Sequence, residues 1–370
     1  MRNLASVQRI AALSPIEGAD AIEVARILGW NVVVKKGEFK VDDLCIYCEI
    51  DSILPEKPEF EFLRPRKFRI KTVKLRGQIS QGIAFPLNIV STVNPAVSIA
   101  FLKEGDDVTE PMGVKKYDPE QESMQVEKEP TFNDKNPLVR TFKKYRYLTI
   151  KFFRKLLGIP SSTKKTAYPS HLFPKTDETR VQNLGKLITD AAGTSCYVTE
   201  KLEGQSASFY KYGKKVGTCS RNMQVHNTDD PRFAMDKKYK IFEQLKKMKG
   251  NYAMQGELVG GKIQGNLYEL PEHDIYFYYV YDIDNRRKLN YEEFMEFCNN
   301  MGVKTVPVLD DNFTLPNSID ELVQYSIGYS QVNPKKMREG VVIVNKYPSV
   351  VRPFFSMKSI NPEYLLKQVD

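Results

Sequence analysis

The chain has 370 residues, of which 41% are hydrophobic and 27% are charged, so it can bury sizeable cores and is not globally disordered. The net charge of +9 and the pI of about 9.0 favour a polyanionic partner such as nucleic acid, although a merely basic protein has the same balance. No apolar run reaches membrane-spanning length, the N-terminus has no signal-peptide core and five Cys are scattered along the chain. We therefore expect a soluble intracellular protein without membrane contact, in the cytoplasm or the nucleus.

Residues 1–112 are predicted to form an all-β module, because short apolar runs recur between turn signals. These runs are Leu4–Leu13, Ile22–Val34, Leu44–Ile50, Phe68–Leu75 and Gly82–Pro86. About five strands in this length suit an OB-type β-barrel, a fold that often holds nucleic acid.

The run Arg64–Gly77 alternates basic with apolar residues, so one face can pack while the other contacts phosphate. A solvated charged edge strand is the alternative.

Residues 113–165 differ in composition from the module before them. Lys115–Pro137 is polar and aperiodic, which is typical of a linker, and Leu138–Leu157 has the spacing of a basic aromatic helix. Such a helix could contact nucleic acid or pack on the following domain.

Residues 166–370 alternate strand and helix patterns, which predicts an α+β domain of mainly antiparallel sheets with flanking helices. Strands are expected at 196–199, 206–210, 216–220, 252–259, 275–283, 303–309, 340–344 and 354–358. One helix is expected from Pro231 to Gly250, a second after Asn290 with Glu293 at its third position, and a third after Ser318 with Glu321.

The segment Thr199-Glu200-Lys201-Leu202-Glu203-Gly204 follows an apolar strand and ends in a glycine that permits a tight turn. A lysine amine must lose its proton before it attacks a phosphate, and burial or a nearby cation favours that neutral form. Lys201 is therefore a candidate nucleophile, and a surface turn is the alternative.

Further charged motifs follow Lys201 in a fixed order. They are Ser220-Arg221-Asn222, Gly256-Glu257-Leu258, Tyr281-Asp282, Glu339-Gly340 and Met357-Lys358. With Lys201 at their head, they resemble the covalent nucleotidyltransferase superfamily of DNA ligases, RNA ligases and mRNA capping enzymes over residues 170–370.

A narrower resemblance covers nearly the whole chain. The segments Phe173–Asn183 and Ile16–Ile22 are similar to the RNA ligases with an N-terminal OB module, the Deinococcus and Naegleria type. Only twelve residues follow Lys358, so we expect no OB module after the nucleotidyltransferase domain, the place where DNA ligases and capping enzymes carry theirs. The longer connector and Tyr281, where relatives often have Phe, depart from the group.

The resemblance implies an ATP-dependent RNA ligase that seals 3′-OH and 5′-phosphate ends through lysyl-AMP and an adenylylated 5′ end, in RNA repair. It implies Mg²⁺ or Mn²⁺ as cofactor, and nicked duplex or broken structured RNA as partner, with the protein acting as a monomer. A GTP-dependent capping-type guanylyltransferase and a non-catalytic RNA-binding protein are the alternatives.

The resemblance also implies roles for individual residues. Lys201 attacks the α-phosphate, and Lys358, Arg221 and Arg180 contact phosphates or ribose of ATP. Glu200 contacts adenine, Tyr281 stacks on it, and Glu203, Glu257 and Glu339 surround a hydrated metal ion. From the residues alone, core packing of Tyr281, a structural role for Arg221 and surface ion pairs for the three carboxylates stay open.

Overall fold

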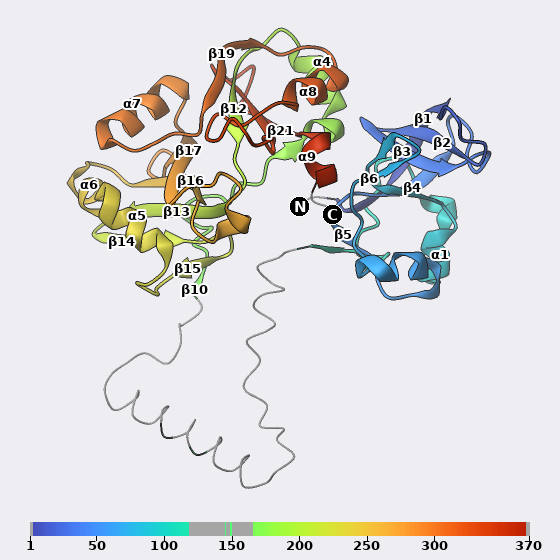
Figure 1. Cartoon of the computed structure of the whole chain (residues 1–370), viewed down its shortest axis with the longest axis horizontal. Helices are drawn as coiled ribbons and strands as arrows, with labels where there is room; N and C mark the ends of the chain where they lie inside the picture. Colours follow the sequence, from blue (N-terminus) through green and yellow to red (C-terminus); the bar gives the residue numbers. More distant parts are fainter. Residues whose placement is uncertain (1–2, 118–144, 146–148, 150–165, 368–370) are drawn as a thin grey trace.

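The computed structural model describes residues 3–117, Tyr145, Thr149 and residues 166–367 (Figure 1). The linker and the basic aromatic helix expected within 113–165 fall almost wholly outside the described residues. Among the described helices, none is both long and apolar enough to cross a bilayer.

The N-terminal part is built on a sheet with strand order β3-β2-β1-β4-β8. Its strands are β1 (Ala5–Pro15), β2 (Ile22–Ile27), β3 (Trp30–Lys35), β4 (Leu44–Cys48) and β8 (Ile83–Pro86). The first half of β1 pairs with β4 and the second half with β2, with a bulge between Ile10 and Ala12. Because a bulge bends and twists a strand, β1 can curl the sheet around one core.

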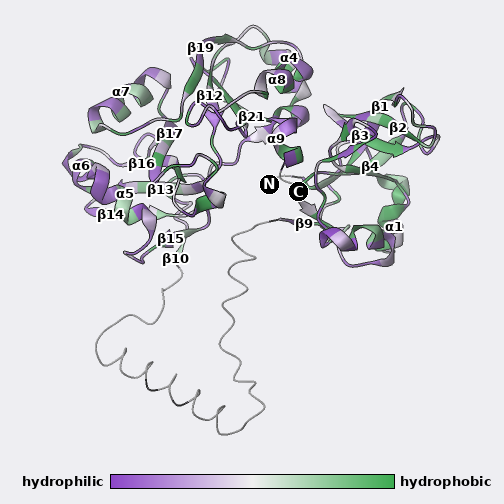
Figure 2. Cartoon of the chain, viewed as in Figure 1, coloured by the Kyte–Doolittle hydropathy of each residue, from purple (hydrophilic) through white to green (hydrophobic). Residues whose placement is uncertain are grey.

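Shorter elements close this module. They are β5 (Ser52–Ile53), the 3-10 helices η1 (Pro58–Arg66) and η2 (Ile99–Phe101), β6 (Val73–Leu75), β7 (Gln78–Ser80), α1 (Ile89–Val93) and β9 (Lys115–Lys116). Apolar residues gather along the strands and α1 (Figure 2). In the basic run, Phe68, Ile70 and Thr72 are buried in alternation, which confirms the packing face, but only β6 forms a regular strand there.

The remaining part contains two larger sheets. The seven-stranded sheet has the order β10-β15-β14-β13-β16-β17-β18, and the five-stranded sheet has the order β11-β21-β20-β12-β19. Every pair is antiparallel except β11 with β21, which agrees with the predicted α+β class. The strands of the seven-stranded sheet are β10 (Thr166–Ala167), β13 (Gln205–Tyr212), β14 (Lys215–Cys219), β15 (Met223–Val225), β16 (Tyr252–Val259), β17 (Asp274–Asp282) and β18 (Arg287–Lys288). Those of the five-stranded sheet are β11 (Thr179–Arg180), β12 (Ser195–Lys201), β19 (Val308–Thr314), β20 (Gly340–Asn345) and β21 (Ser356–Ile360).

Helices cover both sheets (Figure 1). They are η3 (Val181–Asn183), α4 (Gly185–Ala191), α5 (Pro231–Tyr239), α6 (Ile241–Lys247), η4 (Ile263–Asn266), α7 (Tyr291–Met301), α8 (Ile319–Ser326) and α9 (Pro362–Lys367). The caps at Asn290 and Ser318 are as predicted, and the first forms a full capping box with Glu293.

The single helix predicted from Pro231 to Gly250 is wrong. Lys240 adopts a left-handed conformation with φ of 51° and divides it into α5 and α6. The Asp236 carboxylate accepts the Phe242 amide hydrogen at 2.7 Å, which stabilises the break. Each short helix can then bury its own apolar residues against the sheet, including Met235 on α5 and Ile241 on α6.

Specific contacts join the N-terminal module to the rest of the chain. The indole of Trp30, which is fully buried, donates to Asn183 Oδ1 at 2.6 Å. The Gly29 amide donates to the Gln182 carbonyl at 2.9 Å, and a Cβ on Gly29 would lie 2.8 Å from Gln182 Cα. α9 lies between the two parts (Figure 1), where Leu365 packs on the N-terminal core.

Gly340 provides a test of the five-stranded sheet. A Cβ at this residue would lie 2.2 Å from the Ser359 carbonyl oxygen, whereas one at Gly185 would meet only Ile319 Cδ1 at 3.8 Å. We expect Gly340→Ala to lower the free energy of unfolding by about 1–3 kcal/mol in urea denaturation, since the strands must separate. Gly185→Ala is the matched control with little change. Equal stability of the two variants would contradict this packing.

Candidate active site

The candidate nucleophile lies at the end of β12. The register with β20 places Lys201 opposite Gly340, and Lys201 Nζ donates to Glu339 Oε1 at 2.5 Å. Gly204 then lets the chain cross closely over β16, since a Cβ there would lie 2.3 Å from the Leu258 carbonyl oxygen. Lys201 is thus held by backbone pairing and by one ion pair at the edge of a cavity.

This cavity has a volume of about 470 Å³ and lies between the two large sheets. Lys201, Arg221 and Lys358 give it a cationic end, and Val306, Val342 and Val344 give it an apolar wall. A cavity of this size with cations at one end and an apolar wall suits a nucleotide, whose base is flat and whose phosphates are anionic.

Glu257 approaches the cavity from β16, where it pairs in register with Ser206 of β13. Desolvation raises the pKa of Glu257 to about 8; the charge of Lys201 offsets part of this effect, and Glu339 adds to it. The carboxylate therefore lies in a place where its own ionisation is unfavourable unless more positive charge arrives.

Glu203 lies two residues after Lys201 and does not line the cavity. Its amide donates to Tyr268 Oη at 2.7 Å, and its carboxylate accepts a hydrogen bond from the hydroxyl of Tyr364 on α9. Within the described part of the chain, no three His, Cys, Asp or Glu side chains converge as a direct metal-ligand cluster. Of the three predicted metal residues, Glu257 and Glu339 lie near Lys201, and Glu203 is hydrogen-bonded to Tyr364.

Glu200 is almost wholly buried on the cavity wall. Its Oε2 accepts the Gln331 amide hydrogen at 2.8 Å, whereas its Oε1 is buried and has no hydrogen-bond partner among the described residues. Desolvation raises its pKa, and Ser330, Gln331 and Arg338 counteract the shift. A buried acceptor with spare capacity is a suitable partner for the amino group of a base.

Tyr281 is not where the predicted stacking role requires it. It packs against the cluster that contains Tyr168 and Phe173, and it does not line the cavity. Two residues earlier on β17, Tyr279 lines the cavity, and its hydroxyl donates to Glu178 Oε1 at 2.7 Å. Alternate residues of one strand share a face, so the motif identified the face but not the residue.

Arg180 is also displaced from the predicted position. Its buried side chain does not line the cavity, and Nη2 lies 3.5 Å from Asp51 Oδ2 of the N-terminal module. Arg221 and Lys358 do line it, and their contact with ATP stays a prediction.

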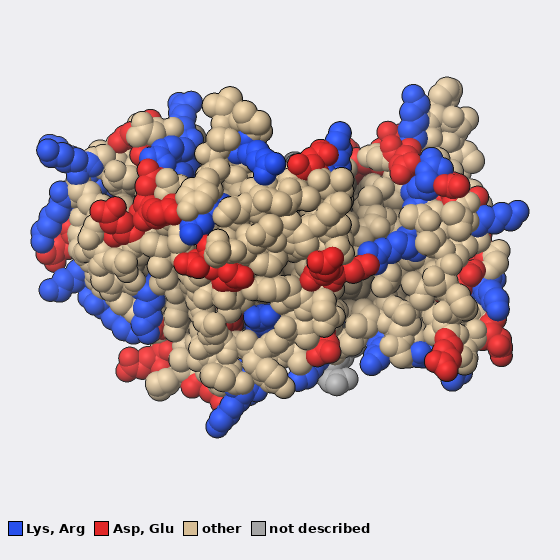
Figure 3. Space-filling view, turned by 90° about the horizontal axis from the view of Figure 1, so that it is seen from above, with Lys and Arg blue, Asp and Glu red and all other residues tan. Residues whose placement is uncertain are grey.

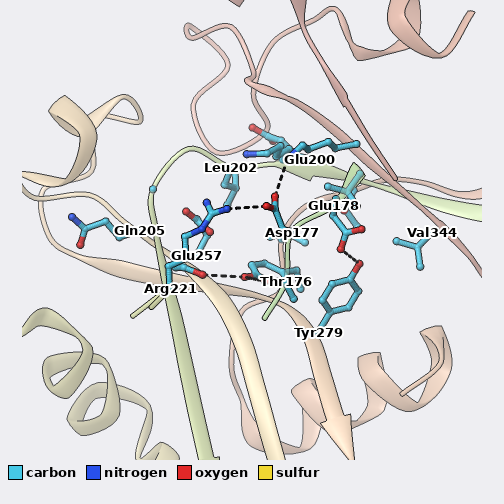
Figure 4. Close-up of a pocket in the computed structure, with 18 of the residues that line it drawn as sticks. Thr176, Asp177, Glu178, Glu200, Leu202, Gln205, Arg221, Glu257, Tyr279 and Val344 are labelled. Carbon is cyan, nitrogen blue, oxygen red and sulfur yellow. Dashed lines mark hydrogen bonds and ion pairs between the residues drawn. The ribbon is translucent and has the colours of Figure 1, made fainter. Parts of the chain in front are cut away.

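The sequence interpretation missed Asp177. This residue lies at the centre of the close-up with Arg221 directed at it (Figure 4), and Lys116 and Lys358 approach the same carboxylate. Asp177 and Glu178 belong to the segment Phe173–Asn183, which was recognised only as a resemblance. Two adjacent acidic residues before the nucleophile were the available signal.

Comparison with known proteins agrees with this arrangement. Residues 4–87 match a family model for an OB-fold domain, and residues 194–360 match the RNA ligase family model. No curated protein matches the sequence.

Solved structures of Naegleria gruberi RNA ligase are similar to the whole chain. The form with PPi is 30% identical, covers 100% of both chains and has a TM-score of 0.80. A lysine-to-alanine mutant of that ligase with ATP and Mn is 30% identical, covers 98% of each chain and has a TM-score of 0.79. A lysine-to-methionine mutant with AMP and Mn gives the same identity and coverage, with a TM-score of 0.80.

The raised pKa of Glu257 predicts a dependence of stability on pH. In the unfolded chain this carboxyl ionises near its ordinary pKa of 4.5, but in the folded protein it does so near 8. Its contribution to the free energy of unfolding is therefore present below about pH 4.5 and is lost as the pH rises through 8. Without divalent metal, we expect Glu257→Gln to gain stability relative to the parent protein between about pH 5 and pH 9 in urea denaturation.

The control for this experiment is Glu296→Gln, which removes an exposed carboxylate from α7. Its difference from the parent protein should stay constant over the same pH range. Parallel pH curves for Glu257→Gln and the parent protein would show that Glu257 is not desolvated.

Proposed function

The chain belongs to the RNA ligase family and is an ATP-dependent RNA ligase, and we propose that Lys201 is its nucleophile and carries AMP as a covalent intermediate. The observation that carries this proposal is the position of Lys201 at the mouth of a cavity that also presents Arg221 and Lys358. The N-terminal module is an OB-fold domain, as the sequence predicted. The alternatives of a guanylyltransferase and of a non-catalytic RNA-binding protein are set aside.

In the proposed reaction, Lys201 Nζ attacks the α-phosphorus of ATP as the bond to pyrophosphate breaks. AMP is next transferred to an oxygen of the RNA 5′-phosphate, and the RNA 3′-OH then attacks that phosphorus and releases AMP. Such transfers depend mainly on positioning and charge neutralisation. Lys358 and Arg221 supply positive charge where the phosphates lie.

The nucleotide is proposed to lie with its base against the apolar wall. Tyr279 and Val342 flank that region, and the buried Glu200 Oε1 can accept a hydrogen bond from the adenine amino group. Tyr279 replaces Tyr281 in this proposal, since Tyr281 lies outside the cavity. The contact of Arg180 with ATP phosphate stays a prediction, because Arg180 reaches Asp51 rather than the cavity.

The carboxylates near Lys201 fit a divalent cation held through water. Glu257 and Glu339 present oxygen ligands of the type that Mg²⁺ and Mn²⁺ prefer, and burial raises the pKa of Glu257, so a nearby cation would favour its ionised form. A bound cation would supply charge for the α-phosphate and favour the neutral Lys201 amine. Glu203 fits a role in orienting α9 better than one as a metal ligand, since its carboxylate accepts a hydrogen bond from the Tyr364 hydroxyl.

RNA is the substrate class of the family. Nicked duplex or broken structured RNA as the physiological substrate, a role in RNA repair and a monomeric state remain proposals. Basic and acidic side chains are interspersed over the face in Figure 3, so no single basic surface there marks the RNA path.

Replacement of the nucleophile is the direct test. We expect Lys201→Ala to lose the protein–AMP adduct by roughly 10³-fold or more after incubation with α-labelled ATP and Mg²⁺, because no other amine replaces Nζ. Lys186→Ala, on the exposed surface of α4, is the matched control and should label fully. Full labelling of the Lys201→Ala variant would refute the assignment of Lys201 as the nucleophile.

The substrate proposal is tested with nicked duplexes that differ only in the sugar of the nucleotide that carries the 3′-OH at the nick. A ribose end should be sealed faster than a deoxyribose end, because the 2′-hydroxyl is the group that distinguishes RNA from DNA. Gel-resolved ligation rates measure this difference. Equal rates at saturating ATP would refute an RNA preference on that side of the break.

A further inference from the structure

Two cations of the active site and one from the N-terminal module face the carboxylate of Asp177. Asp177 Oδ2 lies 2.7 Å from Lys116 Nζ and 3.2 Å from Arg221 Nη2, and Asp177 Oδ1 lies 3.3 Å from Lys358 Nζ. Arg221 and Lys358 are the cavity cations assigned above to the phosphates of ATP. Asp177 itself lines the same cavity.

The surroundings of Asp177 keep it charged. Burial alone would raise its pKa, but Lys358, Lys116 and Arg221 together hold that pKa well below its usual range. The side chain is 39% exposed, so it has room to move toward solvent. The ionised carboxylate of Asp177 therefore lies beside Arg221 and Lys358, the two residues that are also expected to bind phosphate.

The contacts of this anion resemble those of a phosphate group. Carboxylate and phosphate oxygens both accept charge-assisted hydrogen bonds from Lys and Arg. A phosphate bound by Arg221 and Lys358 would have to share these donors with Asp177 and would be repelled by its charge. Asp177 and a bound phosphate therefore cannot both form full ion pairs with Arg221 and Lys358 at the same time.

We propose that Asp177 is a positioning residue that takes the place of a phosphate in the nucleotide-free enzyme and is displaced from Arg221 and Lys358 when a polyphosphate binds. In the empty site it holds the two cations together despite their mutual repulsion. In the occupied site it lowers the affinity for triphosphate and pyrophosphate. This inference rests on the proposed function, because it takes Arg221 and Lys358 as phosphate ligands.

Lys116 gives the displaced carboxylate a partner. It makes the shortest of the three contacts and lies on β9, the short strand that pairs with β5 of the N-terminal module. Lys116 does not line the cavity. Asp177 can thus keep this ion pair while it releases the two cavity cations, so binding of phosphate need not leave the carboxylate unpaired.

The test is calorimetric binding of pyrophosphate to the full-length protein and to Asp177→Asn, which removes the charge at nearly constant shape. We expect the variant to bind pyrophosphate roughly threefold to tenfold more tightly. Binding of adenosine, which has no phosphate, should not change. Asp320→Asn is the matched control, because it removes the ion pair with Arg26 away from the cavity.

Unchanged or weaker pyrophosphate binding by a folded Asp177→Asn variant would overturn the proposal. Loss of binding would mean that Asp177 only organises the cations. The result is separate from the test of the nucleophile, since a failed lysyl-AMP assignment would appear as labelling of Lys201→Ala and leave the pyrophosphate affinities unaffected.

A second measurement uses the unmodified protein. In a crystal structure with pyrophosphate, the Asp177 carboxylate should have left Arg221 and Lys358 while remaining near Lys116. Pyrophosphate bound in the cavity with all three ion pairs of Asp177 intact would contradict the displacement.

Discussion

The register between β12 and β20 is the constraint on which the active site depends. It sets Lys201 opposite Gly340, so that Glu339 lies beside the amine. β21 then pairs with β20 in a register that places Lys358 opposite Val342. A shift of one residue in either pairing would turn these side chains to the opposite face of the sheet. Lys201 (the proposed nucleophile), its partner Glu339 and Lys358 (a proposed phosphate ligand) are thus positioned by backbone hydrogen bonds.

The second sheet completes the site by close approach. Gly204 allows the turn after Lys201 to pass against β16, which brings Glu257 toward the amine. The resulting charge distribution is uneven: Glu257 and Glu339 lie near Lys201, whereas Asp177 lies between Arg221 and Lys358. Lys201, Arg221 and Lys358 each pair with a carboxylate before the substrate arrives, and each of these ion pairs is one that a bound nucleotide or cation can replace.

Much of this could be predicted from local pattern. The strand before Lys201, the caps of α7 and α8 and the barrel-like N-terminal module all follow from residues close together in the chain. The break at Lys240 was missed, because it depends on the Asp236 side chain and on burial of two separate faces. The choice of Tyr279 over Tyr281 was missed, because a period of two residues cannot distinguish them. The cations around Asp177 come from positions 116, 221 and 358, so no local pattern brings them together.

The place of β12 in its sheet also has a consequence for folding kinetics. Both of its neighbours, β19 and β20, lie more than 100 residues further along the chain, whereas the seven-stranded sheet between them is made largely of adjacent hairpins. Closing long loops costs entropy before any contact rewards it, so distant pairings form slowly. The hairpins are therefore expected to assemble early and β12 late. The ability to form the AMP adduct would then return only at the end of refolding. Its recovery would follow the slowest folding step more closely than the recovery of secondary structure would.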